Sequence, residues 1–299
     1  MKKTNKNKIL VSIDFQEESY AALKQSYQVA KFLKADLVLL HVFELPDFLH
    51  SLFIKNEELV MVTAETVTKL TNLANKAAEE TGLTVTSRFE TGKAYIKIVE
   101  IAKEIGARLI IMGKSSNDHR KYMGSNTIHV VSSAPCPVIT LKSAEHRIDF
   151  KDVVIPLDLT KPTAEQTAMA IALGKYFKSN IHIVSVLTGG IFLHRSRIYG
   201  KMLRVERELV KQGISTRLKL YPKTSIPAYK TILKYSEDHN VDLIMLLARQ
   251  DLTPTDQYLG AVAQHIINEA KMPVLSLIPA DNTGNESALD TFWNPFDLY

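Results

Sequence analysis

The chain alternates short apolar runs with helix-like amphipathic stretches, and it does so twice. Each half opens with a run that ends on an aspartate, at residues 8–14 and again at 152–158. Each half closes with another short run, at residues 138–141 and 274–278. Apolar runs of this length are typical of strands buried in a parallel sheet that has helices on both faces. Repetition of a whole strand–helix series therefore predicts two related domains in tandem.

The alternation predicts an α/β fold built from two doubly wound domains. We expect each to hold a five-stranded, Rossmann-like parallel sheet of order 3-2-1-4-5, because crossovers are right-handed and successive elements lie close together. The charged stretch at residues 142–151 is poor in aliphatic side chains and marks the linker. One domain is thus placed at residues 1–142, the second at 151–280 and a tail at 281–299. The aromatic residues of the tail fit docking on the body or plain disorder, with a partner motif as a third interpretation.

Three helical stretches carry an apolar or small face at the spacing of a helix that packs on a sheet. The predicted buried faces are Ala22, Ser26, Val29, Ala30 and Leu33 in the first; Val67, Leu70, Ala74, Ala77 and Ala78 in the second; and Ala168, Ile171, Ala172 and Tyr176 in the third. Gly82 follows the second stretch near its end, where a glycine C-cap would close the helix.

Composition indicates where the protein works more than what it does. The 299 residues are 45% hydrophobic and 23% charged, and no apolar run approaches the about 20 residues of a membrane helix. The basic N-terminus lacks a signal-peptide core, and a single cysteine, Cys136, excludes an internal disulfide framework. We therefore expect a cytoplasmic protein without a membrane span. The net charge of +5 permits anionic partners, although nucleic acid is not an expected partner.

The strongest chemical signal lies between residues 108 and 141. An apolar run ends at Gly113, a polar loop leads to Gly124 and Ser125, and a helical spacing precedes the closing run. Glycine lets a backbone approach a ligand closely, and the unpaired N–H groups at a helix start suit a phosphate. This order of elements therefore favours a phosphate site.

The same stretch resembles the nucleotide loop and last strand of the universal stress protein family. The residues that carry the resemblance are Met112-Gly113, Gly124-Ser125 and Pro137-Val138. ATP-binding members of the family carry Gly-x-x-Gly and, further on, Gly-Ser or Gly-Thr. In this chain Ser116 stands where the second glycine is expected, and the loop is shorter. The resemblance extends over nearly all of both halves.

The resemblance implies a site for ATP or another adenine nucleotide in the first domain. By the family's pattern, Asp14 and Val42 contact the adenine side, and the loop residues contact the ribose and phosphates. The predicted nucleotide-binding residues are Asp14, Val42, Met112, Gly113, Lys114, Ser116, Gly124 and Ser125. Two alternatives remain open from the residues themselves. Asp14 also suits a cap or turn before the next helix, and the loop cations, including Lys114, also suit a solvated surface.

The second half has lost more of the pattern. Ala248 begins the stretch that replaces the glycine-bearing turn, Pro254 stiffens the loop, and Gly260-Ala261 replaces Gly-Ser. The strand-end Asp158 remains, but it is weak evidence by itself. We predict that this half is structural or regulatory and has no phosphate site.

Nothing in the sequence announces catalysis. His41 has no surrounding cluster at metal-ligand spacing, so a satisfied structural histidine is the favoured interpretation. Cys136 lies between two prolines and is expected to pack rather than react. Walker A, Gly-x-Ser-x-Gly and Cys-x-x-Cys motifs are absent from the sequence. The protein is therefore not expected to be an enzyme.

A basic stretch distinguishes the second half from the first. Its cationic residues are His194, Arg195, Arg197, Lys201, Arg204, Arg207 and Lys211, whereas the matching helix of the first half carries Glu57, Glu58 and Glu65. Such a helix can bind an acidic protein, nucleic acid or an anionic membrane, but an ordinary solvated face is the commoner outcome.

Together these observations predict a tandem universal stress protein that acts in the stress response through adenine-nucleotide-responsive binding. The rivals are an interaction scaffold that has lost its nucleotide and an adenine-nucleotide hydrolase of similar fold. Family members pair through their last strands, so the resemblance implies an intrachain pseudo-dimer through residues 138–141 and 274–278. A homodimer and an unidentified protein partner are further expectations.

Overall fold

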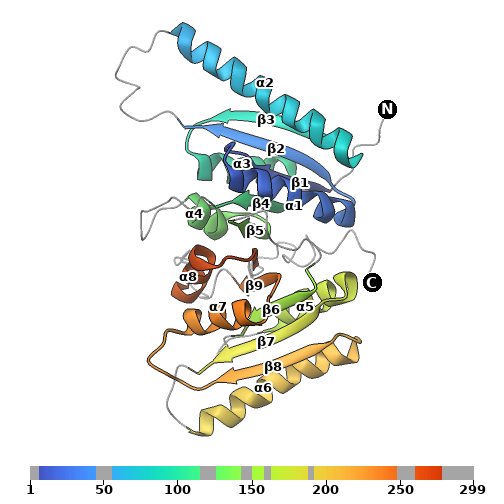
Figure 1. Ribbon diagram of the computed structural model, residues 1–299, viewed down its shortest axis with the longest axis vertical. Helices are drawn as coiled ribbons and strands as arrows, with labels where there is room; N and C mark the ends of the chain where they lie inside the picture. The colour runs from blue at the N-terminus through green and yellow to red at the C-terminus, as the bar shows by residue number, and fades with distance from the viewer. Residues whose placement is uncertain are drawn as a thin grey trace. The chain divides into compact units, whose positions relative to one another are not determined.

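The computed structural model divides the chain into two compact units, the first ending at Ala144 and the second beginning at Glu145 (Figure 1). The structure describes residues 7–44, 56–114, 126–142, 150–157, 163–187, 192–247 and 260–277. The predicted tail at 281–299 lies outside the described residues.

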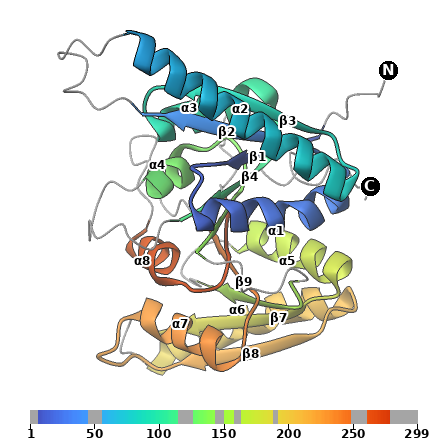
Figure 2. The ribbon, with the colours of Figure 1, turned by 45° about the horizontal axis from the view of Figure 1, so that its top comes forward.

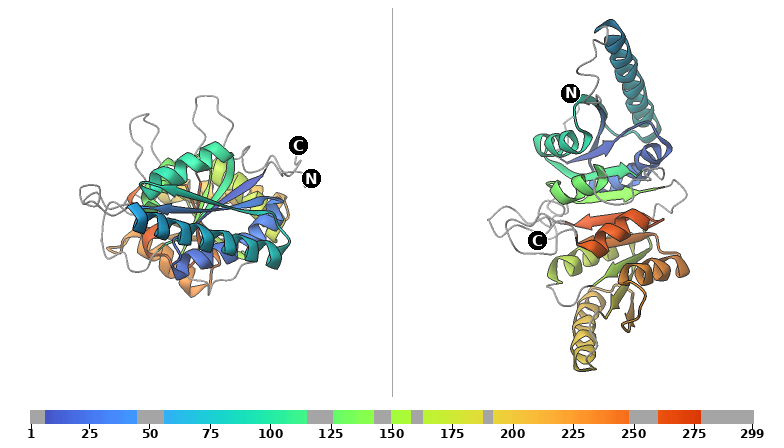
Figure 3. Two further views of the ribbon diagram at one scale, coloured as in Figure 1. Left: turned by 90° about the horizontal axis from the view of Figure 1, so that it is seen from above. Right: turned by 90° about the vertical axis from the view of Figure 1, so that its left-hand side faces the viewer.

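The first unit contains a parallel sheet of order β3-β2-β1-β4-β5, as predicted. Its elements are β1 (Lys8–Ser12), α1 (Glu17–Leu33), β2 (Asp36–Phe43), α2 (Asn56–Thr81), β3 (Val85–Thr91), α3 (Ala94–Ile105), β4 (Ala107–Gly113), α4 (Asn126–Ser133) and β5 (Val138–Leu141). Helices α1 and α2 cover one face and α3 and α4 the other, so β1 and β4 form the centre of the core (Figure 3, right). This double covering explains why both strands are almost uninterrupted apolar runs.

The second unit repeats this topology, with strand order β8-β7-β6-β9-β10. Its elements are β6 (Asp152–Pro156), α5 (Ala164–Phe177), β7 (Asn180–Val186), α6 (Phe192–Lys211), β8 (Thr216–Tyr221), α7 (Ala228–Asp238), β9 (Leu243–Leu247), α8 (Ala261–Glu269) and β10 (Val274–Leu277). Helices α5 and α6 pack together on one face, and α7 packs with α8 on the other (Figures 2 and 3). The predicted fold class is confirmed in both units.

Most residues of the predicted helix faces are buried, Ala78, Ala168 and Ile171 are half-buried, and two are exposed. All five residues named for α1 are buried, as are Leu70, Ala74 and Ala77 of α2. Val67 is 39% exposed, because α2 touches β2 and β3 only through its later turns, as its burial pattern shows. Tyr176 of α5 is 50% exposed, while the neighbouring Met169 and Leu173 are buried in its place. Val67 was predicted wrongly because its turn of α2 does not touch the strands, and Tyr176 because α5 packs through a different face from the one that the sequence spacing indicates.

Local signals were more dependable at helix ends. Gly82 follows α2 with φ +71°, and its N–H donates to the Ala78 carbonyl at 2.9 Å. This left-handed residue is the predicted glycine C-cap.

Cys136 is buried, and burial raises the pKa of its thiol, which keeps it in the unreactive protonated form. Among the described helices, none has the length and apolar character needed to cross a bilayer.

Candidate functional site

The candidate nucleotide site lies at the carboxyl edge of the first unit's sheet. Ser12 of β1 is in register with Leu40 of β2 and Met112 of β4, so these strands end side by side. Asp14 follows β1, Val42 is near the end of β2, and Gly113 ends β4. Carboxyl edges of parallel sheets are where doubly wound proteins place their ligands. The fold therefore brings together the parts of the predicted site that it describes.

The predicted loop residues Ser116, Gly124 and Ser125 lie outside the described residues. Helix α4 begins at Asn126, directly after Ser125 in the chain. The Gly124-Ser125 pair thus directly precedes a helix in the chain, as the sequence predicted. Lys114 continues the strand pairing, because its backbone N–H donates to the Leu141 carbonyl at 2.8 Å.

The Asp14 side chain is exposed and accepts a hydrogen bond within a turn of the fold. Its Oδ1 accepts a hydrogen bond from the backbone N–H of Gln16 at 2.9 Å, which forms a tight turn before α1. This is the cap-or-turn alternative that the sequence left open. A carboxylate can accept several hydrogen bonds through two oxygens, so this turn leaves acceptor capacity for a ligand.

Gly113 also has a reason to be glycine that is independent of any ligand. A Cβ at this position would overlap the backbone carbonyl of Glu18 and the N–H of Ser19. The end of β4 therefore passes directly under the first turn of α1, and only glycine allows that approach. Met112 is 5% exposed, so its side chain belongs to the core and only its main chain is available at the edge.

An aromatic cluster borders this edge and was missed by the sequence analysis. Phe15, which has a left-handed φ of 63°, places its ring 4.8 Å from that of His41. The His41 ring stacks on Phe89 at 5.9 Å, and Lys69 of α2 lies 4.3 Å from the centre of the Phe15 ring. Both neighbours of Phe15 come from other strands or helices, and a local pattern cannot reveal them. The ammonium over the ring adds a cation–π attraction that ties α2 to the site's edge.

His41 behaves as the structural histidine that was favoured. Its Nδ1 lies 2.7 Å from the Ile13 carbonyl oxygen, so an Nδ1–H donates there. Within the described part of the chain, no three His, Cys, Asp or Glu side chains gather in a way that could hold a metal ion.

The carboxyl edge of the second unit's sheet carries different residues from that of the first. Leu157, next to the end of β6, donates its N–H to the Val184 carbonyl at 2.8 Å, as Ile13 does to Leu40 in the first unit. Gly260 precedes α8. Asp158, Ala248 and Pro254 lie outside the described residues, so the predicted loss of the phosphate site there stays a prediction.

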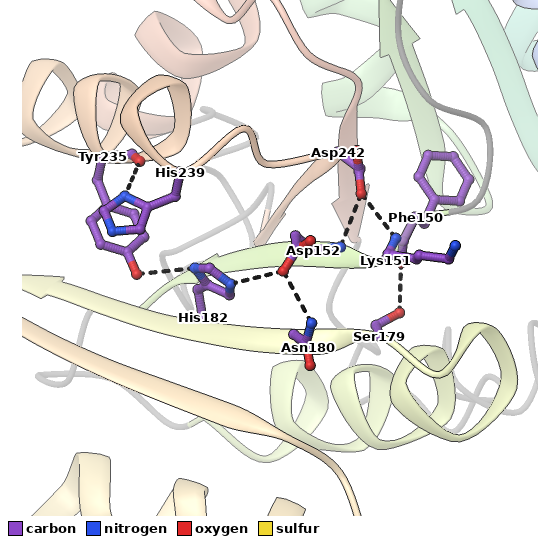
Figure 4. Close-up of polar contacts among 9 residues, drawn as sticks. All are labelled: Phe150, Lys151, Asp152, Ser179, Asn180, His182, Tyr235, His239 and Asp242. Carbon is purple, nitrogen blue, oxygen red and sulfur yellow. Dashed lines mark hydrogen bonds and ion pairs between the residues drawn. The ribbon is translucent and has the colours of Figure 1, made fainter.

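The second unit holds its polar groups at the opposite, amino edge of the sheet (Figure 4). His182 of β7 is 1% exposed, and its Nε2 lies 3.3 Å from Oδ1 of Asp152. Its Nδ1 lies 3.0 Å from the hydroxyl of Tyr235 on α7. The carboxylate can only accept, so Nε2 carries the proton and Nδ1 accepts from the tyrosine O–H. The neutral imidazole thus satisfies both neighbours and joins β6, β7 and α7.

Further hydrogen bonds surround this group. Asp152 also accepts from the Asn180 amide at 3.2 Å, and Asp242 accepts from the N–H groups of Lys151 and Asp152, each at 3.0 Å. Burial is the main cause that lowers the pKa of His182, and it outweighs the opposing attraction of Asp152. The only trace in the sequence is a histidine inside an otherwise apolar strand. Because His182 and Asp242 are buried and their hydrogen bonds are internal, we assign this group a structural role in joining the elements of the fold.

Comparisons with known proteins agree with this architecture. The fold and the strand-end edge define a doubly wound α/β protein of the kind that binds small ligands beyond its strands. Residues 6–142 match the Universal stress protein family. The first unit is thus similar to universal stress proteins along almost its whole length.

Individual relatives extend the comparison. A universal stress protein of Methanocaldococcus jannaschii is 28% identical over 138 residues, which are 45% of this chain and 81% of that protein. The solved structure of a universal stress protein from Archaeoglobus fulgidus covers 91% of this chain and 98% of its own, with a TM-score of 0.68 and 19% identity. A functionally unknown protein from Pseudomonas aeruginosa covers 91% and 92%, with a TM-score of 0.66 and 20% identity. At such identities the structural matches show the fold alone, and that likeness extends across both units.

Proposed function

We propose that the protein is a cytoplasmic, non-catalytic stress-response protein whose first unit binds an adenine nucleotide. The observation that carries the proposal is the meeting of Asp14, Val42 and the end of β4 at one sheet edge. This edge belongs to the unit that matches the universal stress protein family. Nucleotide binding there would report the adenylate state of the cell to a partner protein.

Each group has a plausible chemical role in this proposal. Asp14 would accept hydrogen bonds from the base or ribose, while Val42 would supply apolar contact to the base. Ser116, Gly124 and Ser125 would meet the phosphates, together with the backbone N–H groups at the start of α4. Gly113 and Met112 would act through their main chain, because one is required by packing and the other is buried.

Nucleotide-dependent thermal stability of the full chain tests this proposal. We expect millimolar ATP to raise the Tm of the wild type. Gly124→Val should abolish the rise, because a β-branched side chain would occupy the phosphate approach and restrict φ. Gly260→Val in the second unit is the matched control and should keep the rise. Gly113 is unsuitable for this purpose, since any side chain there disturbs packing.

The alternatives give different results in the same series. No shift with ATP, ADP or AMP, in a protein that unfolds cooperatively, would favour the nucleotide-independent scaffold. Release of inorganic phosphate that disappears in Gly124→Val would favour the hydrolase. The pseudo-dimer through residues 138–141 and 274–278, the homodimer and the protein partner stay predictions.

A further inference from the structure

The second unit carries a concentrated basic surface around its outer strand. Between residues 198 and 234, nine exposed lysines and arginines occur in α6, β8, the following loop and α7. They are Lys201, Arg204, Arg207, Lys211, Arg217, Lys219, Lys223, Lys230 and Lys234. The same span contains two acidic residues, Glu206 and Glu208. We call these nine residues the basic surface.

The fold directs these cations outward. Helix α6 buries Met202, Val205 and Leu209, and it packs on β8 and α5. Arg204, Arg207 and Lys211 are therefore left on the solvent side of the helix. On β8, the exposed Arg217 and Lys219 alternate with the half-buried Leu218. Arg217 is in register with His182, whose ring contacts Tyr235 of α7, so it projects on the face opposite α6. Exposed cations thus lie on α6, on one side of the sheet, and on the opposite face of β8.

The two cations of β8, Arg217 and Lys219, are not neutralised by carboxylates in the part of the chain that the structure describes. Lys211 pairs with Glu208 at 3.2 Å and Lys234 pairs with Asp238 at 3.1 Å, both on the exposed surface. Glu206 lies 3.5 Å from the Thr216 hydroxyl. Among these residues, no carboxylate lies within ion-pair distance of Arg217 or Lys219. Concentrated charge of one sign attracts a partner of the opposite sign.

The neighbouring surface narrows the class of that partner. Insertion into a membrane would need the apolar stripe of α6, which is already used against the sheet. A stable protein interface usually has an apolar centre, whereas the large apolar side chains exposed here are scattered: Tyr199 and Val210 lie eleven positions apart on α6, and Ile226 lies in the loop after β8. Tyr199 is 47% exposed and lies seven positions before Glu206, on the flank of α6 that faces β8. An exposed aromatic ring on a helix that also carries exposed cations suits stacking with an unpaired base.

We propose that the basic surface binds the phosphate backbone of single-stranded nucleic acid without sequence preference. Lysines and arginines would neutralise successive phosphates along β8 and α6, and Tyr199 would stack on a base. This inference revises the expectation from net charge. The net charge of +5 does not reveal the basic surface, because acidic residues elsewhere in the chain offset its positive charge. The proposal is independent of nucleotide binding in the first unit.

Fluorescence anisotropy with a labelled oligouridine of about 20 nucleotides tests this proposal on the full chain. At low salt we expect saturable binding that weakens steeply as salt rises, because bound cations displace counterions from the phosphates. The charge reversals Arg204→Glu/Arg207→Glu and Arg217→Glu/Lys219→Glu should each weaken binding about tenfold or more. Tyr199→Ala should weaken it by less, and circular dichroism should show all variants folded.

The control is Lys76→Glu/Lys93→Glu, which makes the same change in net charge on exposed residues of the first unit. It should leave binding within about twofold of the wild type. An equal loss in the control would overturn the proposal, since overall charge would then suffice. Absence of binding at low salt would overturn it as well. Equal affinity for polyglutamate or for phosphatidylserine vesicles, with no effect of Tyr199→Ala, would assign the surface to an acidic protein or a membrane instead.

Discussion

The two units share one topology but place their polar groups at opposite ends of their strands. In the first unit, Asp14 and His41 stand at the carboxyl edge, where Asp14 is exposed. In the second, Asp152 and His182 stand at the amino edge, where His182 is buried between two side chains. The exposed groups can meet a ligand, while the buried ones satisfy each other. One fold thus leaves polar groups accessible at the carboxyl edge of one copy and joins them by internal hydrogen bonds at the amino edge of the other.

A second contrast concerns two glycines at which an added Cβ would meet close neighbours. Gly113 of the first unit faces backbone atoms of Glu18 and Ser19. Gly174 of the second faces the side chain of Ile214, with a Cβ placed 2.7 Å from Cγ2. A backbone cannot move without disturbing the first turn of α1, whereas an isoleucine side chain can adjust. An added Cβ is therefore expected to be tolerated less well at Gly113 than at Gly174.

The largest effect that we predict comes from this difference. Gly113→Ala should lower the free energy of unfolding by about 3 kcal/mol, because overpacking against backbone cannot relax. Gly174→Ala should cost less, about 1 to 2 kcal/mol, since the Ile214 side chain can shift in part and alanine favours a helix more than glycine does. Urea unfolding followed by circular dichroism measures both. Equal costs at the two positions would show that the backbone contact at Gly113 is not decisive.

Acid should affect the second unit through His182. Its folded pKa is lowered below the ordinary value of 6.5, mainly by burial and against the pull of Asp152, with Arg217 and His239 also opposing protonation. Below about pH 6.5 the unfolded chain therefore binds more protons than the folded one. The contribution to stability is present above that pH and is lost as pH falls toward the folded pKa. Protonated Nδ1 could also no longer accept the hydrogen bond from Tyr235.

We expect urea midpoints to fall between about pH 7.5 and pH 5.5 in the wild type. The double variant His182→Phe/Tyr235→Phe removes the titrating ring together with the hydroxyl that it would leave unpaired. Its midpoint should change less over the same range, whatever its absolute stability. An identical pH dependence in both proteins would mean that other groups cause the acid sensitivity.

Sequence periodicity was sufficient for the fold because strands and helices are local and crossovers have one hand. It also placed Asp14 at the correct sheet edge. It could not find the hydrogen bonds of His182, because their partners Asp152 and Tyr235 lie 30 and 53 positions away along the chain. It could not reveal the packing role of Gly113, because the overlap of an added Cβ with Glu18 depends on how α1 crosses β4. The aromatic cluster around Phe15 escaped for the same reason, as its members come from separate strands and a helix.

The smallest effect concerns the outer strands β3 and β8. Arg88 of β3 donates to both carboxylate oxygens of Glu104, at 2.7 and 2.8 Å, and its Nε donates to Glu90 at 2.8 Å. Arg217 of β8 has no such partner among the described residues. Partly exposed ion pairs are screened by water, so Arg88→Met should cost no more than about 1 kcal/mol, and less at high salt. Arg217→Met should cost nothing or stabilise slightly, because it relieves repulsion from neighbouring cations. Urea unfolding at low and high salt compares the two variants, and a salt-independent loss at Arg217 would mean that its aliphatic stem, rather than its charge, matters to the fold.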